Sequence, residues 1–158
     1  MSRTTTVSVG DRGFWVLDDA FAVWLTYLVD ETGRVAPDPW LTGLAEDWRG
    51  VLECPDLGEV LPELPVDRAR LLLEVATGAR LRAAEAGDVP WDFTRTGKDH
   101  VEVGRVLEVA DGFVALLDGT MPADPPGGAW FLGTGEGWAV MPYRQDSPAL
   151  NQPRFARW

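Results

Sequence analysis

The sequence predicts an α+β fold in which about three N-terminal helices pack on one face of a small antiparallel sheet built from C-terminal hairpins. Hydrophobic residues recur at helical spacing in three segments before residue 87, whereas from residue 101 they alternate with a period of two. Helices and strands that are segregated along a chain are typical of α+β domains. No repeat and no linker divides the 158 residues, so we expect a single globular domain over residues 1–158.

A short strand is expected at residues 5–9, where apolar residues alternate weakly before the turn sequence of residues 10–13. The first helix follows, and either Asp18 or Asp19 can cap its N-terminus. Four apolar residues at i, i+3, i+4 and i+7 form its buried side, and it is expected to end near Gly33. These four residues are Phe21, Trp24, Leu25 and Leu28.

Two more helices are predicted between residues 39 and 86. Asp38 and Pro39 start the second helix, because Asp accepts free amide hydrogens and Pro loses no hydrogen bond at the first helical position. After an irregular connection at residues 54–65, Asp67 is expected to cap a third helix from residue 68 to about residue 86. The expected buried residues are Leu41, Leu44, Trp48 and Val51 or Leu52 in the second helix, and Leu72, Val75, Ala76, Ala79 and Ala83 in the third.

Two hairpins are predicted in the C-terminal half. Alternating apolar residues at 101, 103, 107 and 109 lead to Asp111 and Gly112, a sequence favoured in hairpin turns, and residues 113–117 would form the returning strand. Residues 129–132 and 138–141 flank the glycine-rich residues 133–137 as a second hairpin, and the tail from residue 142 is expected to be irregular. These hairpins would supply the sheet.

Negative charge is concentrated in the first part of the chain. The net charge is −11, and residues 1–63 hold twelve Asp or Glu against four Arg, whereas residues 64–158 hold thirteen acidic against ten basic residues. An acidic surface attracts cationic partners and repels nucleic acid and anionic membranes. We therefore expect neither a nucleic-acid partner nor a membrane partner.

A bacterial cytoplasmic location is expected. The longest apolar run, residues 20–29, is well short of the roughly 20 residues that span a bilayer, and the first residues do not resemble a signal peptide. The single cysteine, Cys54, excludes an internal disulfide and suits a reducing compartment. Thirteen Arg beside one Lys, with abundant Ala and Gly, indicate a GC-rich bacterial genome.

No residue pattern predicts catalysis, a metal or a cofactor. His100 with Asp99 and Glu102 is the arrangement that a general base or metal ligand needs, but one histidine at a loop-to-strand junction is more often a solvated residue. Cys54 is interpreted as a buried structural residue, because no base or second thiol flanks it. The pairs at residues 18–19 and 30–31 lack the spacing of a calcium loop.

Residues 133–137 superficially resemble a phosphate-binding loop. They carry a glutamate but no P-loop lysine, and the segment that follows is predicted as a strand and not as a helix. A hairpin loop is therefore the favoured interpretation. The eight tryptophans are mostly assigned to the core, with Trp15, Trp40, Trp91 and Trp158 left as residues that could anchor a partner if exposed.

The hypothesis that best fits these features is a non-catalytic acidic domain that binds a protein partner with a basic surface. Its sharpest version is a bacterial immunity or inhibitor protein that neutralises a toxin with a basic cleft. The alternatives are a small enzyme or ligand-binding domain that uses His100 and a pocket between helices and sheet, and an adaptor or assembly protein. The expected contact residues are Asp30, Glu31, Glu46 and Asp47, with Trp40 as an aromatic anchor.

Overall fold

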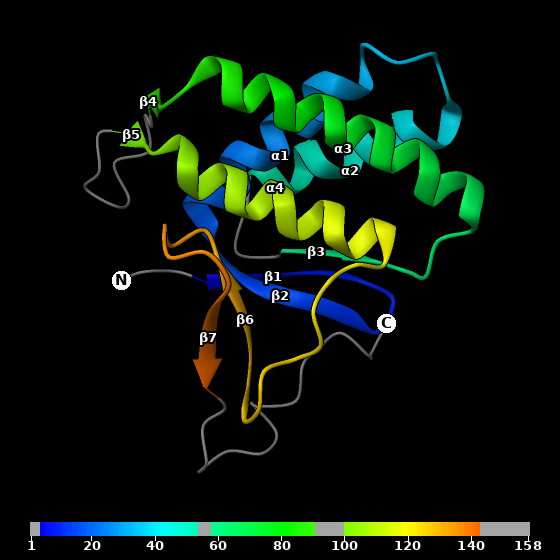
Figure 1. Cartoon of the computed structure of the whole chain (residues 1–158). Helices are drawn as coiled ribbons and strands as arrows, with labels where there is room; N and C mark the ends of the chain where they lie inside the picture. Colours follow the sequence, from blue (N-terminus) through cyan, green and yellow to red (C-terminus); the bar gives the residue numbers. More distant parts are fainter. Residues whose placement is uncertain (1–3, 54–57, 91–99, 143–158) are drawn as a thin grey trace.

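Four helices lie on one side of a five-stranded mixed sheet in the part of the chain described by the computed structural model, residues 4–53, 58–90 and 100–142 (Figure 1). The fold is therefore α+β, as predicted. Residues 54–57, 91–99 and 143–158 lie outside the described part, and with them the predictions for Cys54, Asp99, Trp91 and Trp158.

The main sheet has the strand order β3-β1-β2-β6-β7. Strands β1 (Thr4–Val9) and β2 (Arg12–Leu17) form an antiparallel hairpin at its centre. Strand β3 (Glu59–Leu61) pairs in parallel with β1, and β6 (Gly128–Leu132) pairs in parallel with β2. Strand β7 (Ala139–Pro142) completes the sheet by antiparallel pairing with β6.

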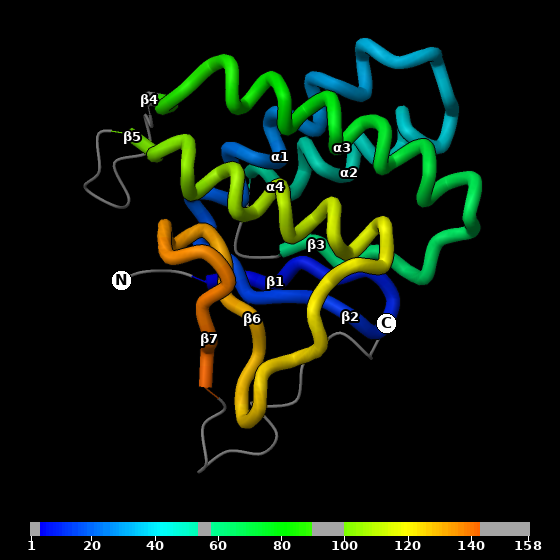
Figure 2. Tube along the Cα trace, in the orientation of Figure 1, coloured from blue at the N-terminus to red at the C-terminus, as the bar shows by residue number. Residues whose placement is uncertain are grey.

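Two parts of the sheet prediction are wrong. The sheet is mixed and not purely antiparallel, and its centre comes from the N-terminus and not from C-terminal hairpins. Helices intervene in the sequence between β2 and β6, and such a long crossover allows parallel pairing. The chain trace in Figure 2 shows β6 beside β2 despite this separation. The predicted strand at residues 5–9 and the hairpin of β6 with β7 are confirmed.

The helices are not all N-terminal, because the predicted hairpin at residues 101–117 is a fourth helix, α4 (Val103–Asp118). Its valines suggested strands, yet its buried residues also recur at helical spacing, and packing against α1, α3 and the sheet favours the helix. Gly112 is no turn residue: a Cβ atom there would overlap the Leu132 side chain and lie 3.1 Å from Cε1 of Phe14. The buried apolar residues of α4 are Val106, Val109, Ala110, Phe113 and Leu116.

The three predicted helices are confirmed as α1 (Asp18–Thr32), α2 (Pro39–Glu53) and α3 (Val66–Ala86). The carboxylate of Asp38 accepts hydrogen bonds from the backbone N–H groups of Trp40 (2.9 Å) and Leu41 (3.0 Å), as expected for an N-cap. The caps predicted for α1 and α3 are wrong, because Leu17 and Pro65 are the N-cap residues and the aspartates lie in the first turns.

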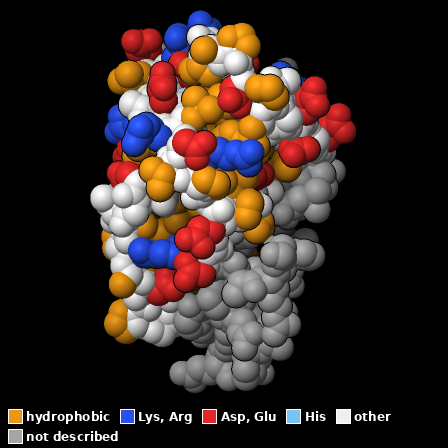
Figure 3. All heavy atoms as spheres, turned by 90° about the vertical axis from the view of Figure 1, so that its right-hand side faces the viewer, with side chains coloured by type: hydrophobic (Ala, Val, Ile, Leu, Met, Phe, Trp, Pro, Cys, Tyr) orange, Lys and Arg blue, Asp and Glu red, His pale blue; other side chains and the backbone are white. Residues whose placement is uncertain are grey.

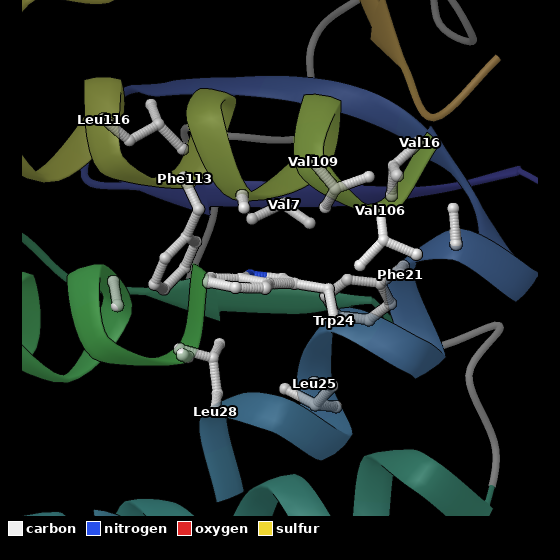
Figure 4. Close-up of a cluster of buried hydrophobic side chains, with 14 of the residues drawn as sticks. Val7, Val16, Phe21, Trp24, Leu25, Leu28, Val106, Val109, Phe113 and Leu116 are labelled. Carbon is white, nitrogen blue, oxygen red and sulfur yellow. The ribbon is translucent and has the colours of Figure 1, made fainter. Parts of the chain in front are cut away.

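Trp24 of α1 lies at the centre of the hydrophobic core (Figure 4). Its indole contacts the Phe113 ring edge to face, with 6.0 Å between the ring centroids. Figure 4 shows Val7 of β1 and Val106 of α4 near the same indole. All four residues of the predicted α1 stripe are buried, as are the five predicted for α3, so the helical periodicity identified these faces correctly.

A separate pair of short strands, β4 (Val89–Pro90) and β5 (His100–Val101), joins α3 to α4. The two strands are antiparallel and lie at the ends of the two helices (Figure 1). In the described residues, no helix combines the length and apolar character required to cross a membrane.

Candidate functional site

Three of the predicted contact residues are exposed carboxylates on the outer sides of α1 and α2. Asp30 lies in the last turn of α1, and Glu46 and Asp47 lie in the middle of α2 beside the buried Trp48. None of the three forms an ion pair with another residue of the described ranges. Their negative charge is therefore available to an external partner.

Glu31 has a different environment from its neighbour Asp30. Its side chain is turned toward α3, where Nε of Arg82 lies 2.5 Å from the Oε2 atom of Glu31. Nε of Arg34, just after α1, lies 3.8 Å from the same oxygen. The residue is only 8% exposed. Gly78 of α3 makes this approach possible, because a Cβ atom at that position would overlap the Glu31 carboxylate. Glu31 is thus engaged inside the chain.

Trp40 is half-buried at the start of α2. The guanidinium of Arg68, from the first turns of α3, lies 5.2 Å from the centroid of the Trp40 ring. This is the geometry of a cation–π contact. One part of the ring is therefore covered by the chain's own arginine.

A buried carboxylate that the sequence did not single out lies next to this surface. Glu59 of β3 is 8% exposed, and burial raises its pKa to about 7. The indole of Trp48 opposes the shift and the charge of Asp47 adds to it. The Trp48 N–H nevertheless lacks the geometry of a hydrogen bond to any described group. The charge of Asp47 thus acts on Glu59, so the acidic side of α2 lies close to the edge strand β3.

A second polar cluster joins α1, α4 and the loop between β6 and β7. Nη2 of Arg105 lies 2.5 Å from Oδ1 of Asp19, and its Nε donates a hydrogen bond of 2.7 Å to the carbonyl of Gly133. The Glu108 carboxylate accepts hydrogen bonds from the backbone N–H groups of Gly133 (3.1 Å), Gly135 (3.1 Å) and Gly137 (2.8 Å).

The glycine-rich loop at residues 133–137 is therefore an anion nest that holds an internal carboxylate. Its three glycines have positive φ angles, between 72° and 92°, which orient successive amides toward one side. The predicted hairpin loop is confirmed by the pairing of β6 with β7. Because Glu108 occupies the nest, this cluster holds the fold together and offers no open site.

His100 is exposed on β5, and Glu102 is the exposed N-cap residue of α4. No hydrogen bond or ion pair joins His100 to another residue in the described part of the chain, and Asp99 lies outside that part. Among the residues that the structure describes, no three His, Cys, Asp or Glu side chains are grouped so that they could hold a metal ion.

Comparisons with models of known protein families, with curated proteins and with solved structures find no match to this chain.

Proposed function

We propose that this chain is a non-catalytic domain that binds a basic protein partner through the outer sides of α1 and α2. The sharpest form of the proposal is an immunity or inhibitor protein that covers the basic cleft of a toxin. One observation carries it: Asp30, Glu46 and Asp47 are exposed and have no counter-ion among the described residues. Complementary charge of this kind accelerates association and selects the partner.

The pairing of Glu31 with Arg82 narrows the set of contact residues. A carboxylate that already has a cation inside the chain offers little to an external one, so Asp30, Glu46, Asp47 and the Trp40 ring are the proposed contacts. Glu59 is also expected to respond to binding. A partner cation near Asp47 would favour the charged form of the Glu59 carboxylate. Binding is therefore expected to release a proton near pH 7.

The same surface suits an adaptor that binds without inhibiting, and only the partner's activity separates the two roles. The enzyme alternative gains no support from the described residues, among which His100 forms no hydrogen bond or ion pair.

The test uses the products of the genes that adjoin this one. Each is coexpressed with the chain to score relief of growth inhibition, and binding is measured at low and high salt. Glu46→Lys with Asp47→Lys should weaken binding at least about tenfold without lowering Tm. The matched control is Glu74→Lys with Glu85→Lys, which makes the same charge change on exposed sites of α3. Equal losses in both variants, or no loss in the first, would reject the assigned surface.

A further inference from the structure

A cleft of about 480 Å³ opens between the β1–β2 turn, the segment from β3 to α3, and the last turn of α4. Its apolar walls include Val9, Leu64, Leu116 and Leu117. Among the described residues that line it, none belongs to α1 or α2, so the cleft is separate from the acidic surface described above. Its volume lies within the roughly 300–1,000 Å³ typical of ligand pockets.

Two exposed carboxylates stand at this cleft, those of Asp11 and Glu63. The backbone brings them together: the N–H of Gly10 donates a hydrogen bond of 2.9 Å to the carbonyl of Leu61, which ties the β1–β2 turn to the end of β3. Neither carboxylate forms an ion pair with another described residue. The cleft thus combines apolar walls with two carboxylates that have no ion-pair partner among the described residues.

Arg12 is the one basic residue among the described residues that line the cleft, and its guanidinium is already engaged. Its Nη2 atom donates hydrogen bonds to the carbonyls of Met121 (2.8 Å) and Pro122 (2.7 Å). Neither of these residues lines the cleft. Arg12 therefore fixes the connection after α4 and forms no ion pair with Asp11 or Glu63.

The end of α4 adds to the negative potential. Leu116 and Leu117 belong to the last turn of the helix, which contains no basic residue, and the exposed Asp118 follows them. The C-terminal end of a helix carries a partial negative charge. Figure 3 shows this side of the molecule, where acidic and basic side chains lie beside hydrophobic ones.

We propose that this cleft receives a lysine or arginine side chain of the protein partner. The aliphatic stem would pack against Leu64, Leu116 and Leu117, and the charged group would lie between Asp11 and Glu63. Long cationic side chains commonly bury the stem on apolar surface and keep the charged end near polar groups. The identity of the ligand as a protein side chain rests on the proposed function, to which the cleft adds a second, independent contact.

The test is an NMR titration of the isolated ¹⁵N-labelled full chain with the peptide acetyl-Ala-Ala-Lys-Ala-Ala-amide. The expected result is weak, saturable binding with amide shifts at residues 9–12, 63–64 and 116–118. The same peptide with norleucine in place of lysine keeps the stem without the charge, and it should bind at least about tenfold more weakly. Asp11→Asn with Glu63→Gln should abolish the shifts, whereas Glu74→Gln with Glu85→Gln removes equal charge from exposed sites of α3 outside the cleft and should preserve them.

Shifts confined to residues 30 and 46–47, or shifts at the cleft that persist in the Asp11→Asn, Glu63→Gln variant, would overturn the proposal. Tighter binding of free 1,5-diaminopentane than of the lysine peptide would assign the cleft to a small diamine and overturn the side-chain assignment. The titration contains no partner protein. A negative result therefore rejects the cleft and not the proposed contact surface on α1 and α2, and a negative partner-binding test would not change the titration.

Discussion

Arg105 of α4 and Asp19 of α1 form a buried ion pair, in which Nη2 lies 2.5 Å from Oδ1 and the two residues are 4% and 5% exposed. Both have further partners: Arg105 donates to the carbonyl of Gly133, and Asp19 accepts a hydrogen bond of 2.7 Å from the N–H of Ala20. One cation thus connects the start of α1, the first half of α4 and the loop after β6.

Replacing Arg105 with methionine is expected to lower the free energy of unfolding by about 3–5 kcal/mol, because Asp19 is left as an uncompensated buried charge. The exposed pair of Arg80 with Asp111 has the same 2.5 Å separation but side chains that are 37% and 52% exposed. Arg80→Met should therefore cost less than about 1 kcal/mol. Urea unfolding of the two variants measures the two losses in the free energy of unfolding. Equal losses would show that burial does not control the energy of these ion pairs.

The sequence predicted those elements whose pattern is long and one-sided. Helices α1 to α3 repeat their apolar residues over several turns, and no other regular structure buries such a stripe. Strand β2 was missed because it is a short apolar run directly before a helix, a pattern that fits either structure. Helix α4 was missed because Asp111 and Gly112 resemble a turn. Glycine is instead required at position 112 because the Leu132 and Phe14 side chains leave no room for a Cβ atom.

The exposure of Asp30, Glu46 and Asp47 was predictable from the sequence, but the burial of Glu31 and Glu59 was not. Asp30, Glu46 and Asp47 lie off the apolar stripes of their helices, and position on a helix is readable from sequence. The pairing of Glu31 with Arg82 joins residues far apart in the chain and depends on how α1 meets α3. The burial of Glu59 likewise depends on where β3 lies against α2, for which no local pattern exists.

Alanine substitutions at Gly112 and Gly104 of α4 test how closely this helix approaches the sheet. Alanine is favoured over glycine in a helix, but at position 112 the added methyl group overlaps Leu132 and crowds Phe14. Gly112→Ala is therefore expected to destabilise the chain by about 1–3 kcal/mol. Gly104→Ala adds the same atom where nothing lies within 4 Å, and should stabilise by about 0.5–1 kcal/mol. Stabilisation by both substitutions would contradict the packing described for α4.

Glu59 makes stability depend on pH in a defined direction. Because its pKa rises from 4.5 to about 7 on folding, the folded chain retains a proton that the unfolded chain releases. The contribution of Glu59 to the free energy of unfolding is fully present below about pH 4.5 and is lost as the pH rises through 7. The total loss is about 3 kcal/mol. Glu59→Gln should remove this part of the slope when urea unfolding is compared at pH 5 and pH 8. The exposed Glu63→Gln is the control, and an identical slope in the Glu59→Gln and wild-type chains would refute the prediction.

Glu108 supplies the anion of the nest at residues 133–137, so Glu108→Ala should free the three backbone N–H groups that now donate to it. The expected loss of stability is about 1–3 kcal/mol, since hydrogen bonds to a charged acceptor are among the stronger ones and solvent replaces part of the loss in this partly exposed loop. Glu136→Ala removes an exposed carboxylate from the same loop and should change stability by less than about 0.5 kcal/mol.

An empty nest is expected to bind a small carboxylate again. Formate, compared with chloride at equal ionic strength, should therefore raise the Tm of the Glu108→Ala variant more than that of the wild-type chain, whose nest is already filled. Differential scanning fluorimetry over a formate series measures this difference. If the two chains respond equally, the amides of residues 133, 135 and 137 do not bind a free carboxylate, and the prediction is wrong.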